Sequence, residues 1–151
     1  MSYIFSILLT ISTFTCLFRQ EKQMQIMQQT QLSEGKMTYR APDYLRWEYT
    51  APEPIVWEMD GNNSNMNRQV KAIVSLILNS INGEYLKDNN QFEVTRQGDI
   101  YTLIPKKREL QRLFEQMTIE IDKQTDIARK VTFTEKNGDT TVIRFFDLQT
   151  Q

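Results

Sequence analysis

The sequence predicts an α+β fold that is mainly antiparallel β-sheet, with roughly eight strands and one or two helices. Three observations predict it. Short segments such as residues 45–49 alternate apolar and polar side chains with a period of two. Turn signals such as Gln97-Gly98 and Asn137-Gly138 separate these segments. One internal segment, residues 70–81, keeps a sustained helical spacing.

The composition limits both the size and the chemistry of the protein. A chain of 151 residues with 40% hydrophobic residues fills one core, so we expect a single domain over residues 1–151. Histidine is absent and cysteine occurs once, which excludes histidine-based triads, Cys-His dyads, intrachain disulfides and the usual zinc sites. The five glycines are too far apart for a phosphate-binding loop. We therefore expect a protein that is not an enzyme and binds no cofactor and no metal.

The charge balance argues against a polyanionic partner. Eighteen basic residues face nineteen acidic ones, so the net charge is -1. Binding to nucleic acid is driven by a basic excess that this chain lacks. One local exception is the basic group Lys106, Lys107, Arg108 and Arg112, which either contacts a partner or anionic headgroups or forms a solvated turn.

The uncharged N-terminal stretch, residues 3–18, has three possible interpretations. As a transmembrane helix it is short and carries several hydroxyl groups. As a signal peptide it has an apolar region, but no Lys or Arg precedes it and no small-x-small cleavage site follows it. As part of the fold, it places Ile4, Ile7, Leu8 and Ile11 on one helical face. We favour a short N-terminal helix over residues 1–12, with a remnant of a signal peptide as the alternative.

The strands follow in order from the period-two segments. Phe14, Cys16 and Phe18 alternate with residues 13, 15 and 17, which predicts a first strand with a buried thiol, and the Gln- and Met-rich residues 20–31 are interpreted as its exposed extension. A proline enforces the turn at residues 41–43. The other predicted strands are residues 35–39, 45–49, 55–59, 91–96, 99–104, 117–121, 131–133 and 141–146.

The main helix is predicted from a spacing of i, i+3, i+4, i+7, i+8 and i+11. Its apolar positions are Val70, Ile73, Val74, Ile77, Leu78 and Ile81. Ser64 is a plausible N-cap and Gly83 a plausible stop. Residues 106–114 are predicted to form a helical turn or a loop.

One helix of this length cannot cover a sheet of eight strands. Two arrangements therefore remain open. Either the side chains pack together in a closed core, or a curved sheet leaves its concave side partly open for an apolar ligand, with the helix as a movable cover.

Three stretches of the chain resemble the outer-membrane lipoprotein carrier family LolA, in particular its Bacteroidetes-like branch. They are residues 13–22, residues 35–52 and residues 103–107, the last followed by the strand at 117–122. The second stretch is the most specific, because it looks like the family's strand-turn-strand signature ending in an aromatic pair. The better-known proteobacterial pattern has an Arg directly before the proline, whereas Ala41 stands there and Arg40 lies one residue earlier, so we do not expect Arg40 to act as a latch.

The resemblance implies a half-open, strongly curved β-barrel with one or two helices over its mouth. It implies a periplasmic, non-catalytic, monomeric carrier that shields the acyl chains of lipoproteins between an inner-membrane lipoprotein-releasing transporter and an outer-membrane acceptor. The alternative is a protein-interaction or structural domain of the same fold without a lipid cavity. The side chains expected to line the concave face are Leu45, Trp47, Tyr49, Phe92, Val94, Tyr101, Leu103, Ile119, Ile121, Val131 and Phe133, and those of the lid helix are Ile73, Ile77 and Leu78.

Overall fold

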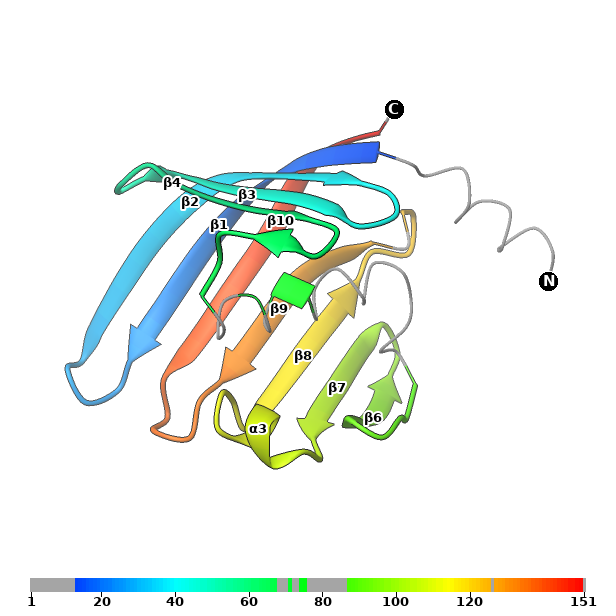
Figure 1. Ribbon diagram of the computed structural model, residues 1–151. Coiled ribbons are helices and arrows are strands. Elements are labelled where there is room, and N and C mark those ends of the chain that lie inside the picture. The colour runs from blue at the N-terminus through cyan, green and yellow to red at the C-terminus, as the bar shows by residue number, and fades with distance from the viewer. Residues whose placement is uncertain (1–12, 68–70, 72–73, 76–86, 126, 151) are drawn as a thin grey trace, which may run out of the picture.

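The computed structural model describes residues 13–67, 71, 74–75, 87–125 and 127–150. Within these residues the chain forms a ten-stranded sheet in which every neighbouring pair of strands is antiparallel (Figure 1). The elements are β1 (Thr13–Met24), β2 (Gln29–Arg40), β3 (Tyr44–Ala51), β4 (Ile55–Asp60), β5 (Asn63–Ser64), β6 (Phe92–Gln97), β7 (Ile100–Pro105), α3 (Arg108–Gln111), β8 (Gln116–Ile121), β9 (Ala128–Thr134) and β10 (Thr140–Thr150).

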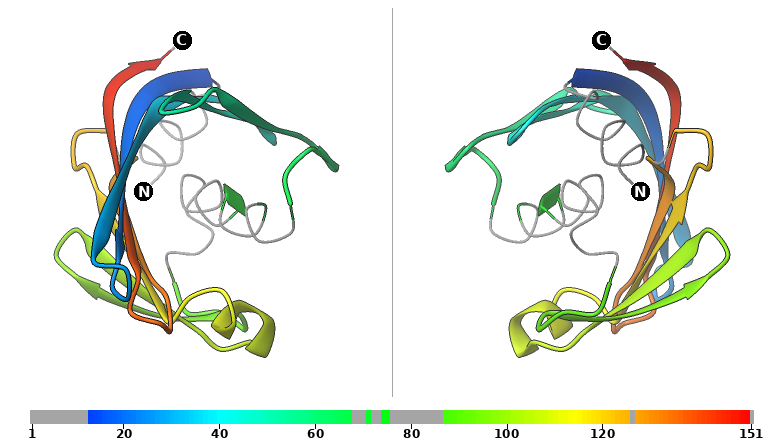
Figure 2. Two further views of the ribbon diagram at one scale, coloured as in Figure 1. Left: turned by 90° about the vertical axis from the view of Figure 1, so that its left-hand side faces the viewer. Right: turned by 90° about the vertical axis from the view of Figure 1, so that its right-hand side faces the viewer.

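The sheet consists of two meanders that meet at its centre. The strand order is β5-β4-β3-β2-β1-β10-β9-β8-β7-β6, so each meander pairs strands that follow one another in the chain. The exception is the pairing of β1 with β10, in which Phe18 lies opposite Phe145. Among the described residues, β5 and β6 are the edges of an open sheet. Figure 2 shows that this sheet is curved, with a convex and a concave side.

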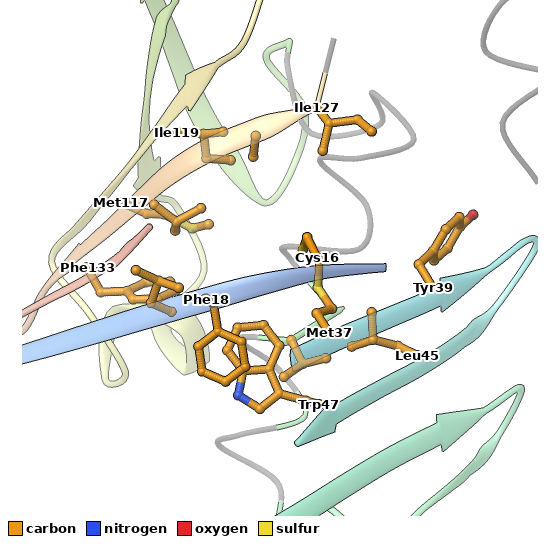
Figure 3. Packing of buried hydrophobic residues seen from close by; sticks show 14 of the residues in the cluster. Cys16, Phe18, Met37, Tyr39, Leu45, Trp47, Met117, Ile119, Ile127 and Phe133 are labelled. Atoms are coloured by element: carbon orange, nitrogen blue, oxygen red, sulfur yellow. The ribbon is translucent and has the colours of Figure 1, made fainter. Parts of the chain in front are cut away.

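The core lies on the concave side of the sheet. Buried and exposed residues alternate along the strands, as expected when one face of a sheet is covered. On β1, Phe14, Cys16 and Phe18 are buried, and on β3 Leu45 and Trp47 are buried, as the period-two pattern predicts. Figure 3 shows side chains of β1, β2, β3 and β9 gathered in this cluster. The sheet carries most of the buried hydrophobic residues, so the packing of its concave face determines the shape of any site there.

Side chains take the place of a neighbouring strand along β6 and along the part of β4 that the two-residue β5 does not cover. Beside β4, Asn65 accepts a hydrogen bond from the Glu58 N–H at 2.8 Å and donates one to the Val56 carbonyl at 3.0 Å. Beside β6, Asp88 accepts from the Val94 N–H at 2.5 Å, and the Asn89 side chain accepts from the Phe92 N–H at 2.9 Å. These side chains satisfy backbone groups that would otherwise be free to pair with another chain.

The first difference from the sequence prediction concerns residues 20–31. They do not form one strand with an exposed extension, because β1 ends at Met24, a turn follows and β2 begins at Gln29. The turn contains no Gly, Pro, Asn or Asp; instead Gln28 adopts a φ of 50°. The described residues form ten strands, because the two-residue β5, which was not predicted, joins the nine segments predicted as strands.

The second difference concerns the start of the predicted helix. Ser64 is not an N-cap, because it lies in β5 opposite Met59 and residues 65–67 after it are not helical. Its hydroxyl accepts a hydrogen bond from the Met66 N–H at 3.1 Å within this connection. Lys71, Val74 and Ser75 are helical, whereas the rest of residues 68–86 and the predicted N-terminal helix at 1–12 lie outside the described residues. Residues 106–114 contain one short helix, α3, as predicted for a helical turn.

Candidate functional site

A pocket of about 240 Å³ opens on the concave side of the sheet. β1, β3, β4, β9 and β10 contribute to it, together with the segment that follows α3 and the helical residue Val74. Its lining residues are Gln20, Lys22, Trp47, Tyr49, Trp57, Val74, Leu113, Phe114, Phe133, Glu135, Thr141 and Ile143. Most of these side chains are apolar, which suits an apolar ligand.

Aromatic side chains in mutual contact form one wall of the pocket. Phe18 stacks on Trp47 with ring centroids 4.2 Å apart, and Tyr49 meets Trp57 edge to face at 5.3 Å. Gly35 makes this arrangement possible, since a Cβ there would lie 2.7 Å from the Phe18 ring. Such ring contacts stabilise the wall beyond the burial of its apolar area.

A second aromatic group closes the other side. Phe114, which is 1% exposed, stacks on Phe92 at 6.2 Å and meets Phe133 at 6.1 Å. Phe114 follows α3, and the backbone N–H of the next residue, Glu115, donates to the Thr134 carbonyl at 2.6 Å. The end of the α3 segment is thereby attached to β9 beside the pocket.

The polar lining residues of the pocket are Gln20, Lys22, Glu135 and Thr141. The Tyr49 hydroxyl donates to Gln20 Oε1 at 2.8 Å. Burial raises the pKa of Tyr49 above its ordinary value, and the neighbouring Trp47 and Gln20 side chains oppose this shift. Trp47 Nε1 is buried, and among the described residues no acceptor lies in hydrogen-bonding geometry with it. Lys22 and Glu135 are half-buried.

The strand register places all eleven residues predicted to line the concave face on one side of the sheet. Val94 lies opposite Leu103, Tyr101 opposite Ile119, and Ile119 opposite Val131. Seven are buried: Leu45, Trp47, Phe92, Leu103, Ile119, Val131 and Phe133. Four are partly buried and pack against the core: Tyr49, Val94, Tyr101 and Ile121.

Only three of these eleven residues line the pocket itself, namely Trp47, Tyr49 and Phe133. The others belong to the surrounding core. Their contact with a ligand stays a prediction.

Sequence reasoning missed several lining residues. Trp57 and Ile143 lie in segments whose period-two pattern was recognised, so their inward positions could have been read from it. Leu113 and Phe114 come from an aperiodic segment and gave no such signal.

The residues predicted to form the lid, Ile73, Ile77 and Leu78, lie outside the described residues. Two described helical residues between them show where this segment touches the sheet. Val74 is 4% exposed and lines the pocket, and the Ser75 hydroxyl lies 4.0 Å from the Met59 sulfur. Residue 74 therefore already occupies part of the concave side.

Other chemistry finds little support in the described residues. They contain no group of three or more His, Cys, Asp or Glu side chains placed to hold a metal ion. No described helix has both the length and the apolar character needed to cross a membrane. Arg40 lies over the Tyr44 ring at 4.1 Å and does not contribute to the pocket lining.

Comparison with known proteins supplies the family. The family model described as "Outer membrane lipoprotein carrier protein LolA" matches residues 9–151. This chain belongs to the LolA family. The carriers of this family are non-catalytic and typically periplasmic. The narrower Bacteroidetes-like branch stays a prediction.

Solved structures agree at the level of the fold. MucB in complex with MucA(peri) is similar with a TM-score of 0.54 and 13% identity, over 99% of this chain and 55% of that chain. The Pseudomonas aeruginosa MucA/MucB complex gives 0.52 and 11%, over 99% and 56%. The LolA superfamily protein NE2245 from Nitrosomonas europaea gives 0.45 and 11%, over 97% and 92%. This LolA-family chain thus spans little more than half of the MucB chains. A search of curated proteins finds no match.

Proposed function

We propose that this protein is a periplasmic carrier that shields the acyl chains of lipoproteins and transfers them from the inner to the outer membrane. The observation that carries the proposal is the aromatic-walled pocket on the concave side, in a chain of the LolA family. The partners would be an inner-membrane lipoprotein-releasing transporter and an outer-membrane acceptor.

The energetics explain why such a carrier is needed. Exposing hydrocarbon to water costs about 0.8 kcal/mol per CH₂ group. Exposing a diacyl anchor with on the order of 30 such groups to water therefore costs more than ~20 kcal/mol of free energy. A cavity that removes this surface from water permits transfer that free diffusion does not.

The size of the pocket supports a closed state. Pockets for small ligands commonly measure about 300–1,000 Å³, whereas this one measures about 240 Å³ and Val74 forms part of its wall. We propose that the segment around Val74, with Ile73, Ile77 and Leu78, moves away when acyl chains enter. The rest of the concave face, from Leu45 to Val131, would then become the cavity lining.

The polar groups of the pocket determine which end of an acyl chain lies beside them. The buried Trp47 N–H lies near the Tyr49 hydroxyl, but among the described residues no acceptor lies in hydrogen-bonding geometry with it, and Lys22 lines the same pocket. An ester, amide or carboxyl oxygen at the polar end of an acyl chain would satisfy the Trp47 donor. The hydrocarbon would then extend along the apolar face.

The test is titration of the full chain with a fluorescent fatty-acid probe, followed by competition with a diacylated lipopeptide. We expect saturable binding that the lipopeptide displaces. Trp57→Ala should weaken probe binding several-fold because it removes one wall of the pocket. Val56→Ala is the matched control, since Val56 is the neighbouring residue in β4, is 38% exposed and does not line the pocket.

A folded protein that binds no probe, or a probe that the lipopeptide cannot displace, would contradict the carrier proposal. Equal affinities for Trp57→Ala and Val56→Ala would place binding elsewhere.

A second candidate is a protein-interaction domain of the same fold with a filled interior. It is favoured by the likeness to MucB, which was solved in complex with MucA(peri). The blocked edges beside β4 and β6 argue against binding a partner by strand addition, so such a partner would use another surface. This candidate predicts no acyl binding and a defined complex with a protein.

A further inference from the structure

The turn between β1 and β2 exposes large apolar side chains at the end of the sheet. Ile26 is 84% exposed and Met27 61%, and Leu32 on β2 beside them is 69% exposed. These are the three most exposed large hydrophobic residues described. The surrounding sequence, residues 23–33, carries no charge although a quarter of the chain is charged. Ile26 and Met27 in one uncharged turn, with Leu32 three residues into β2 and opposite Glu21, distinguish this tip from the single exposed hydrophobic residues of an ordinary surface.

The tip is held in place by the neighbouring hairpin. The Gln25 N–H donates to Asp139 Oδ1 at 3.0 Å, and Asp139 is itself buried in the turn between β9 and β10. Gly138 in that turn packs against the Gln25 side chain, since a Cβ on the glycine would lie 3.2 Å from the Gln25 Cγ. The turn that carries Ile26 and Met27 is thus held by contacts with the β9–β10 turn.

A basic segment lies at the same end of the sheet. Figures 1 and 2 show the β1–β2 turn, the β9–β10 turn and α3 side by side at this end. The segment at α3, residues 106–112, carries four basic residues and one acid. Lys106, Lys107, Arg108 and Arg112 are all exposed. Lys136, in the turn between the two other features, is exposed as well. Glu109 and Glu115 lie in or beside this segment and Glu135 and Asp139 beside Lys136, so these five basic residues leave this end with only a small positive balance, in a chain whose net charge is -1.

We propose that this end of the sheet docks on the surface of an anionic lipid bilayer, with Ile26, Met27 and Leu32 entering the headgroup region and the basic residues at α3 contacting lipid phosphates. A narrow apolar tip suits shallow insertion between headgroups. Flanking basic side chains add attraction to anionic lipid that falls off within a Debye length. None of these residues lines the acyl pocket, and Arg112 directly precedes two residues that do, Leu113 and Phe114.

The experiment is co-sedimentation of the full chain with vesicles of phosphatidylcholine alone and of phosphatidylcholine with about one third phosphatidylglycerol. We expect binding to the mixed vesicles that weakens as salt is raised. The double variant Ile26→Ser/Met27→Ser should bind on the order of ten-fold more weakly. Lys106→Gln/Lys107→Gln should lose the preference for the anionic vesicles and most of the salt dependence.

The matched control is Ile100→Ser. Ile100 is 44% exposed and lies at the start of β7, whereas α3 follows the end of that strand. All variants keep the uncharged, largely apolar residues 3–18, so this segment cannot account for a difference in vesicle binding between them. The tip variant should also keep the acyl-probe affinity of the parent, which separates a failure of this proposal from a failure of the carrier function.

Parent protein that does not sediment with anionic vesicles at low salt would overturn the proposal. A tip variant that binds as tightly as Ile100→Ser would overturn it too. Binding that appears only when the vesicles contain membrane protein would assign the tip to a protein partner instead.

Discussion

Gly35 shows at the scale of one residue how a missing side chain shapes the aromatic wall. It lies opposite Phe18 on β1 and Tyr49 on β3. A Cβ at this position would lie 1.8 Å from the Glu48 carbonyl oxygen and 2.7 Å from the Phe18 ring. No side chain fits there without moving backbone, so the stack of Phe18 on Trp47 depends on a glycine.

Gly35→Ala is therefore expected to lower the free energy of unfolding by more than ~2 kcal/mol, measured by urea denaturation. Gly98→Ala is the comparison, because nothing lies within 4 Å of its added Cβ and its cost comes from a φ of +63° alone. That cost should be about 1 kcal/mol. Equal losses in the two variants would mean that the contacts at Gly35 do not matter.

Cys16 gives a prediction on pH. Burial raises the pKa of its thiol from 9.0 to about 12. Between these pH values the unfolded chain loses the proton and the folded chain keeps it, so the folded state binds more protons and stability falls as pH rises. The raised pKa of Tyr49 acts in the same direction from its ordinary value of 10.0 upward.

We expect the free energy of unfolding to decrease above pH 9 by on the order of 1 kcal/mol per pH unit, and Cys16→Ala to reduce this slope. Guanidinium melts at several pH values between 8 and 11 measure it. The slopes, not the absolute stabilities, are compared, since the alanine variant also loses packing. Identical slopes would exclude the thiol as the cause.

At the scale of elements, the edge strand β6 depends on two side chains before it. Asp88 and Asn89 accept hydrogen bonds from the N–H groups of Val94 and Phe92. Asp88→Ala/Asn89→Ala should expose these groups and promote self-association by edge pairing, detected by sedimentation velocity. Asn90→Ala, an exposed neighbour, is the control. A double variant that sediments like the control would show that the edge is protected by other means.

Most strands could be predicted from the sequence because each half-buried strand carries its own alternating pattern. Residues 45–49 predicted the inward and outward faces of β3 correctly. The turn between β1 and β2 could not be predicted, because glutamine, isoleucine and methionine carry no turn signal, and the left-handed Gln28 is imposed by the pairing of the strands. β5 is too short to show any period.

At the scale of the whole molecule, the strand order and the pocket are the parts that a local pattern does not contain. The pairing of β1 with β10 joins opposite ends of the described chain, and only the tertiary fold specifies it. The face shared by the predicted lining residues follows from the same register. The position of Phe114 against Phe92 and Phe133 follows from how the loop after α3 attaches to β9, which no spacing indicates.

The pairing of β1 with β10, where the two meanders meet, determines how the molecule responds to force. Thr150 lies opposite Phe14, so the beginning of β1 and the end of β10 meet at the same end of the pair. A force that pulls these two ends apart acts across the strands, along the direction of their hydrogen bonds. It therefore loads the hydrogen bonds between β1 and β10 one after another instead of all together. We therefore expect β1 and β10 to unzip at low force, which separates the two meanders from each other.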